Sequence, residues 1–129
     1  MNRKGMGWMF MKTPVKLNQS DKIFLMKIIE AEIEKTSKLR KSVSRIEIRA
    51  GRVYLYSLYE QVRMEGVTYT VPLIDGKYLE FISARITLYD KAYRNCSLDW
   101  QRPNDQWMTL ETGSLVECIQ EAEINDWIE

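Results

Sequence analysis

The sequence predicts an α+β fold, in which an antiparallel β-meander of six or seven short strands forms a curved sheet or small barrel, with an N-terminal and a C-terminal α-helix. Three observations predict it. Two segments have the apolar spacing of amphipathic helices, the chain between them alternates polar and apolar residues, and turn sequences rich in glycine or proline separate the alternating runs.

The chain is long enough for one domain with one core. It has 129 residues, of which 45% are hydrophobic and 29% charged, which is ordinary for a globular protein. We expect residues 20–129 to form a single α+β domain after an N-terminal arm, residues 1–19, that is partly disordered. For residues 1–10 three alternatives stay open: a disordered arm, an edge strand led by Gly7-Trp8, or sequence upstream of a start at Met11.

The first helix is predicted from about Asp21 to Lys38. Asn18 or Ser20 can cap it, because a short side-chain oxygen there accepts a backbone N–H of the first turn. Apolar residues cover one broad side and charged residues the other, so the helix should pack on the sheet. The predicted inner residues are Phe24, Leu25, Met26, Ile28, Ile29 and Ile33.

A first hairpin is predicted at Ala50-Gly51, where two runs with a period of two meet. With a two-residue loop, Ile48 faces Val53 and Ile46 faces Leu55. Both strands then place their apolar residues on the same face of the sheet, as the register of a half-buried sheet requires.

A second hairpin is predicted at Asp75-Gly76, with Gly76 in the left-handed region and Val71 and Tyr69 opposite Leu79 and Phe81. After Phe81 the apolar residues change phase, which predicts a bulge or break near Ser83. A third hairpin is expected where the runs 97–101 and 106–110 flank the turn sequence 102–105.

The C-terminal helix should begin at the capping box formed by Ser114 and Glu117. Its predicted inner stripe is Leu115, Cys118, Ile119 and Ala122, with Trp127 as a further candidate.

Several classes of chemistry are disfavoured by composition. The chain has no histidine and only two cysteines, which removes Ser-His and Cys-His nucleophiles and the usual zinc ligands. Asp90, Asp99 and Asp105 lie on different predicted elements and are interpreted as turn and strand-end residues. We therefore expect no catalytic residue, metal or cofactor. With no secretory signal or membrane-spanning stretch in the sequence, we expect a cytoplasmic protein with reduced cysteines.

The rhythm of short strands, with Gly7-Trp8 at its start and a Tyr-Asp step at Tyr89-Asp90, resembles small uncharacterised β-meander proteins of conjugative and other mobile elements of Bacteroides-like bacteria. The resemblance covers most of the chain, except for the predicted helix at 21–38. It implies an accessory protein of a mobile genetic element and carries no activity.

The outer face of the first hairpin is one candidate binding surface. Basic and aromatic side chains interleave there, namely Arg45, Arg49, Arg52, Tyr54 and Tyr56, with Glu47 among them. This composition suits single-stranded nucleic acid, because arginine binds phosphate and tyrosine stacks on bases. It also suits a protein partner, and the simplest interpretation is cross-strand packing on a solvated sheet.

A second candidate surface lies near the third predicted hairpin, where Trp100, Arg102 and Trp107 stand with Tyr93 and Met108. The competing interpretations are that both tryptophans belong to the core or line a small-molecule pocket in a barrel.

Charge is distributed unevenly. Residues 1–65 hold 14 Lys and Arg against 7 Asp and Glu, and residues 66–129 hold 5 against 11. Together these features predict a non-enzymatic accessory or inhibitor factor that binds another protein, as a monomer or homodimer. A nucleic-acid-binding module is the alternative.

Overall fold

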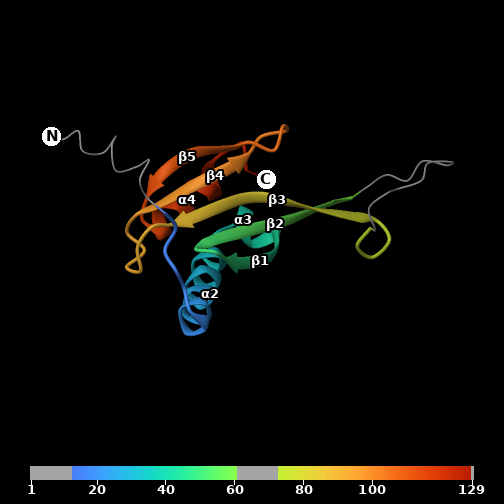
Figure 1. The fold of residues 1–129 in the computed structure, drawn as a ribbon. Helices are drawn as coiled ribbons and strands as arrows, with labels where there is room; N and C mark the ends of the chain where they lie inside the picture. Colours follow the sequence, from blue (N-terminus) through green and yellow to red (C-terminus); the bar gives the residue numbers. More distant parts are fainter. Residues whose placement is uncertain (1–12, 61–72, 129) are drawn as a thin grey trace.

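The computed structural model describes residues 13–60 and 73–128, which form an α+β domain with one antiparallel sheet (Figure 1). The strand order in the sheet is β1-β2-β3-β4-β5, so every strand pairs with its neighbour in sequence. The strands are β1 (Val43–Arg49), β2 (Arg52–Glu60), β3 (Tyr78–Leu88), β4 (Cys96–Gln101) and β5 (Trp107–Gly113), and the helices are α2 (Gln19–Glu34), α3 (Lys38–Ser42) and α4 (Leu115–Ile124).

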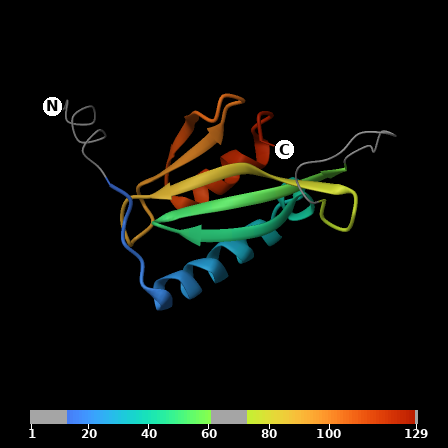
Figure 2. The ribbon, with the colours of Figure 1, turned by 45° about the vertical axis from the view of Figure 1, so that its right-hand side comes forward.

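The meander is confirmed, but the described residues form five strands rather than six or seven. Within these residues the sheet is open rather than a closed barrel, because β1 and β5 each have one pairing neighbour. Figure 2 shows β1 and β5 at opposite edges of the sheet. None of the described helices is long and apolar enough to cross a membrane.

The first hairpin has the predicted register. Ile48 pairs with Val53 and Ile46 with Leu55, across a two-residue turn in which Ala50 and Gly51 both have positive φ, 53° and 74°. Two positive φ angles are the mark of the tight turn whose twist matches that of paired strands. Local sequence therefore determined which face of β1 and β2 is apolar.

The second hairpin turn is centred on Gly76, one residue later than the predicted pairing of Val71 with Leu79 would require. Ile74 pairs with Tyr78 across a three-residue turn in which Gly76 has φ 76°, as expected for that glycine. The predicted partners Tyr69 and Val71 lie outside the described residues, as do residues 1–12.

The predicted bulge at Ser83 is present within one continuous strand, β3. Leu55 pairs with Ala84 while Tyr56 pairs with Ile82, so Ser83 is the extra residue. Its hydroxyl donates to the carbonyl oxygen of Leu55 at 3.1 Å. The bulge lets β3 keep apolar residues on the core face on both sides of the phase change.

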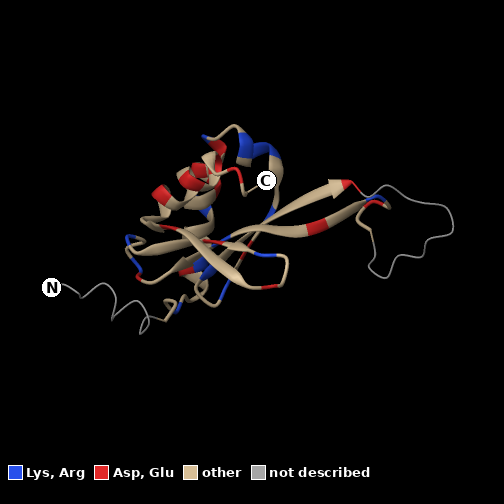
Figure 3. Ribbon diagram, turned by 90° about the horizontal axis from the view of Figure 1, so that it is seen from above, with Lys and Arg blue, Asp and Glu red and all other residues tan. Residues whose placement is uncertain are grey.

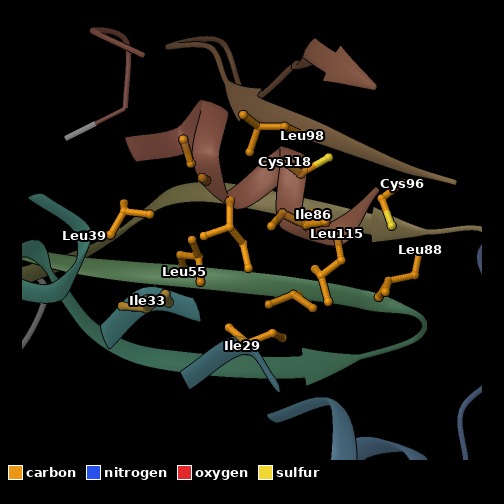
Figure 4. Close-up of a cluster of buried hydrophobic side chains, with 14 of the residues drawn as sticks. Ile29, Ile33, Leu39, Leu55, Ile86, Leu88, Cys96, Leu98, Leu115 and Cys118 are labelled. Atoms are coloured by element: carbon orange, nitrogen blue, oxygen red, sulfur yellow. The ribbon is translucent and has the colours of Figure 1, made fainter. Parts of the chain in front are cut away.

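One cluster of buried side chains joins the helices to one face of the sheet (Figure 4). Ile29 and Ile33 from α2 and Leu115 and Cys118 from α4 point toward Leu55, Ile86 and Leu98 from the strands. The prediction that α2 buries Leu25, Ile29 and Ile33 is confirmed, and the prediction that it buries Phe24 is wrong, because Phe24 is 61% exposed. Only one narrow side of α2 fits against β1 and α4.

The helix predicted to reach Lys38 ends at Glu34, and α3 follows it. The Thr36 hydroxyl donates to the carbonyl oxygen of Ile33 at 2.6 Å, where it competes with the backbone bond of a continued helix. Glu123 of α4 then caps α3: its carboxylate accepts from the backbone N–H groups of Ser37, Lys38 and Leu39.

This cap changes the acidity of Glu123. Burial alone would raise its pKa, but the hydrogen bonds from Lys38, Leu39 and Ser37 outweigh that effect and lower the pKa to about 2. Helix α4 itself begins at the predicted capping box of Ser114 and Glu117.

The arm ahead of α2 packs on one end of the sheet. The backbone N–H of Val15 donates to the carbonyl oxygen of Leu88 at 2.8 Å, and the N–H of Leu88 donates to the carbonyl oxygen of Gly51 at 3.0 Å. A Cβ atom added to Gly51 would collide with the carbonyl oxygen of Val15. The first hairpin turn, the arm and the end of β3 therefore meet at what we call the turn end of the sheet.

Candidate binding face of the sheet

The side of the sheet opposite the helices carries the residues that alternate with the core positions. We call it the open face. A row of directly paired residues crosses all five strands there: Glu47, Tyr54, Arg85, Asp99 and Thr109. Such cross-strand neighbours lie about 5 Å apart, close enough for their side chains to interact.

Asp99 anchors the middle of this row. Its side chain is 3% exposed, and it accepts hydrogen bonds from Arg85 Nε at 2.9 Å, Thr87 Oγ1 at 2.9 Å and Thr109 Oγ1 at 3.0 Å. Three donors and an opposite charge satisfy a carboxylate that would be costly to bury alone. The interpretation of Asp99 as a turn or strand-end residue is therefore wrong, since it lies within β4 and is buried.

The guanidinium of Arg85 is also held from its other side, by Trp107. Its central carbon lies 3.9 Å from the centroid of the Trp107 ring. Trp107 in turn meets Tyr54 edge to face, with ring centroids 6.4 Å apart. Tyr54 lies on β2 and Trp107 on β5, with β3 and β4 between them, and in a flat sheet such strands would be about 14 Å apart. The two side chains must therefore lean toward each other over the centre of the open face.

A second group lies on the open face beside the row. Arg45 is stacked on Tyr56 at 3.9 Å from the ring centroid and forms a two-pronged ion pair with Glu80, at 2.8 and 3.0 Å. The Tyr56 hydroxyl donates to Glu47 at 2.8 Å. The ion pair lowers the pKa of Glu80, and burial together with the Glu47 contact raises that of Tyr56.

Arg49 joins the two groups. Its guanidinium lies 4.3 Å from the centroid of the Tyr54 ring and 3.8 Å from Glu47, with its side chain 52% exposed. The open face thus carries three arginines stacked on three aromatic rings, and each arginine also has a carboxylate beside it. Hydrogen-bonded carboxylates thus hold Arg45 and Arg85 in place before any partner binds, whereas Arg49 has a looser contact with Glu47.

The structure brings four of the five predicted hairpin residues together on the open face: Arg45, Arg49, Tyr54 and Tyr56. Tyr54 is not exposed as expected but 9% exposed, because Arg49 and Trp107 cover its ring. Arg52 pairs with Arg49 and Thr87, so it also belongs to the open face by register, and it stands at the turn end beside the arm. Sequence reasoning missed Arg85, Asp99 and Glu80.

The second predicted cluster does not form. Trp107 pairs with Gln101 while Trp100 pairs with Met108, so the two tryptophans point to opposite faces of the sheet. Trp100 packs against the core and meets Trp127 edge to face at 4.8 Å, and Arg102 is exposed in the turn. Trp127, predicted for the inner stripe of the last helix, lies beyond its end and is 59% exposed.

Nucleophiles and metal ligands are not assembled in the described parts of the chain. No group of three acidic or cysteine residues there could hold a metal ion. Cys96 and Cys118 are buried, and burial raises the pKa of Cys118 to about 12, far from a reactive thiolate. Asp90 accepts from the backbone N–H groups of Arg94 and Asn95 and acts as a loop-forming residue, as predicted.

Comparisons with known proteins do not assign this chain to a family. No family model, curated protein or solved structure matches it. The likeness to mobile-element proteins therefore stays a prediction.

Proposed function

We propose that this protein is a non-enzymatic binding factor that recognises another protein through the open face of its sheet. The observation that supports the proposal is the set of stacked pairs Arg45/Tyr56, Arg49/Tyr54 and Arg85/Trp107. Tyrosine, tryptophan and arginine are the residues that most often dominate the binding energy of protein interfaces.

The prearrangement of these side chains favours affinity. Ordering a long side chain on binding costs about 0.5–1.5 kcal/mol. Asp99 already holds Arg85, and Glu80 already holds Arg45, so a partner that docks here would meet side chains with little freedom left to lose. An accessory or inhibitor role suits a chain whose candidate site offers contact area rather than reactive groups.

The charges of the open face favour a protein over a nucleic acid. Arg45, Arg49 and Arg85 each have a carboxylate within 4 Å, and a phosphate would compete with it. A nucleic-acid module based on Arg45, Arg49, Arg52, Tyr54 and Tyr56 therefore stays the alternative. It predicts micromolar or tighter binding of a labelled single strand that weakens steeply with salt, and fluorescence anisotropy would measure it.

The proposal is tested by affinity capture from native extract with three matched baits: the wild-type protein, the double variant Arg49→Ala/Trp107→Ala, and Phe24→Ala. Phe24 is an exposed apolar residue on α2, away from the open face, and serves as the control. Circular dichroism would first establish that all three are folded.

We expect wild type and Phe24→Ala to retain the same protein at mild salt and the double variant to lose it. Loss of two hot-spot residues at about 2 kcal/mol each corresponds to roughly a thousandfold in affinity. Equal retention by all three baits, or retention of nothing by the wild type, would contradict the proposal.

A further inference from the structure

Strands β3 and β4 diverge along their length. β3 pairs with β2 from Tyr78 to Thr87, but it pairs with β4 only from Arg85 to Leu88. Figures 1 and 2 both show β4 rising away from β3 beyond this stretch. In the described part of the chain, β3 therefore has no strand on its second side over residues 79–84. We call the space between this edge and the end of β4 the slot.

The alternation of hydrogen bonds shows which backbone groups point into the slot. In antiparallel strands, residues that exchange both hydrogen bonds with their partner alternate with residues whose groups point to the other side. The two-residue turn makes Arg49 and Arg52 such a bonded pair, and the alternation continues from there along β2. By this alternation Phe81 bonds to β2, whereas Glu80 and Ile82 direct their N–H and C=O groups into the slot.

The contacts at the two ends of the slot agree with this direction. Tyr78, two residues before Glu80, exchanges backbone hydrogen bonds with Ile74 at 2.8 and 2.9 Å, and at the other end Arg85 pairs with β4. Between them, no other described residue bonds to the backbone groups of Glu80 and Ile82. Residues 78–84 also contain no lysine or proline, the residues that commonly prevent a strand edge from pairing. This edge can therefore accept another strand.

An aromatic hollow of about 290 Å³ lies beside the edge. Four rings from β2, β3, β4 and the chain after α4 line it in two pairs: Tyr59 with Phe81, at 5.7 Å between centroids, and Trp100 with Trp127, at 4.8 Å. Tyr59 is 48% and Trp127 59% exposed, so ring surface is open to a ligand. None of the described lining residues is charged, and Figure 3 shows the projecting part of β2 and β3 mostly tan.

The edge and the hollow together determine the form of the occupant. Free N–H and C=O groups along a strand edge are satisfied by an extended main chain, whereas a helix bonds its own groups. Paired residues on neighbouring strands point to the same face, so the residue opposite Phe81 would enter the hollow. The uncharged rings favour an aromatic or aliphatic side chain there.

The size of the slot favours a short segment over a second copy of this chain. The pairing of Tyr78 with Ile74 closes one end and β4 closes the other, about 23 Å apart along an extended strand. A flexible segment fits between these ends more easily than the edge of a second folded sheet. The slot is continuous with the open face, because Ile82 pairs with Tyr56 there.

We propose that the slot binds a short extended segment of a partner protein. The segment pairs with Glu80 and Ile82 as an added strand and places one apolar side chain in the aromatic hollow. This site goes beyond the proposed function, which concerns side-chain contacts on the open face, and one partner can occupy both because they are continuous.

An NMR titration of the wild-type protein with a synthetic peptide tests this proposal. The probe is a peptide blocked at both ends, with a central phenylalanine, a threonine on each side of it and a valine beyond each threonine. We expect saturable shifts of the backbone amides of Glu80 and Ile82 and of the indole N–H groups of Trp100 and Trp127, and none in α2. The same peptide N-methylated at both threonines loses its donors to β3 and should bind about tenfold more weakly or worse.

Two variants test the hollow. Trp127→Ala and the matched control Phe24→Ala each remove one exposed aromatic side chain. The first should weaken peptide binding by about tenfold and the second should leave it within about twofold.

Three results would overturn the proposal: no saturable shifts at millimolar peptide, equal binding of the N-methylated peptide, or shifts at the edges of β1 and β5 instead. Self-association of the protein through the amides of Glu80 and Ile82 would also overturn it, because the occupant would then be a second copy. The peptide does not depend on Arg49 or Trp107, so failure at the slot is distinguishable from failure of the open face in the capture test.

Discussion

Replacing Asp99 with alanine tests how the open face is held together. The substitution removes the acceptor of three hydrogen bonds, from Arg85, Thr87 and Thr109, and leaves the guanidinium of Arg85 without its carboxylate. The side chain of Arg85 is 15% exposed, so water can replace little of what is lost.

The size of the effect follows from this burial. Removing one partner of a buried ion pair typically costs 3–5 kcal/mol, and the residual exposure of Arg85 places Asp99→Ala at about 3 kcal/mol. Asp99→Asn keeps the volume and one acceptor oxygen, so we expect about half that loss. For a domain of this size, 3 kcal/mol corresponds to a fall in Tm of about 12 °C.

Urea unfolding followed by tryptophan fluorescence would measure both variants against wild type, with the slope m as a check that the unfolded state is unchanged. Asp105→Asn is the control, since Asp105 is an exposed turn carboxylate and should change stability by less than about 0.5 kcal/mol. A loss below about 1 kcal/mol for Asp99→Ala would refute the role of Asp99 as the anchor of the open face.

Three further predictions concern other parts of the fold. The pKa of Glu123 is about 2 in the folded protein against an ordinary 4.5, so its cap of α3 stabilises the fold fully above about pH 4.5 and this stabilisation is lost as pH falls toward 2. Glu123→Gln should lower the free energy of unfolding by about 1 kcal/mol at neutral pH and make it less dependent on pH over that range, as measured by urea titrations. An unchanged pH profile would contradict the cap. Gly51→Ala should lower the free energy of unfolding by about 3 kcal/mol and Gly76→Ala by about 1 kcal/mol, because both glycines have positive φ but only Gly51 contacts the arm. Equal losses of stability in thermal melts would show that this contact contributes nothing. Cys96 and Cys118 should resist a thiol reagent at mildly alkaline pH in the native protein and both react in urea, and rapid native labelling would contradict their burial.

The predictable features of the fold are those that neighbouring residues determine. The register at Ala50-Gly51 follows from a two-residue turn, and the bulge at Ser83 follows from a change of apolar phase that a regular strand cannot accommodate. The capping box at Ser114 and Glu117 is likewise local. Each depends on residues within one element or one turn.

The features that sequence reasoning missed depend on exact register or on long-range contacts. The loop between β4 and β5 holds residues 102–106 rather than the predicted 102–105. Trp107 therefore pairs with Gln101 and Trp100 with Met108, so the two tryptophans point to opposite faces. The cap of α3 joins Glu123 to Ser37, Lys38 and Leu39, which precede it in the sequence by 84 to 86 positions.

The candidate site was half predictable for the same reason. Arg45, Arg49, Tyr54 and Tyr56 share a hairpin and could be grouped from alternation alone. Arg85 and Asp99 come from β3 and β4, and only the full strand order places them in one row with Tyr54. An acidic residue in the middle of the otherwise uncharged segment Cys96–Gln101 was the one signal that could have identified the buried pair.

The most direct test of the proposed binding face is photo-crosslinking in native extract. A photoreactive amino acid replaces either Gln101, which pairs with Trp107 on the open face and belongs to none of the stacked pairs, or Phe24 on α2. Both side chains are at least partly exposed. We expect one discrete crosslinked protein from position 101 and none from position 24. Crosslinks of equal yield from both positions, or from position 24 alone, would contradict the proposed binding face.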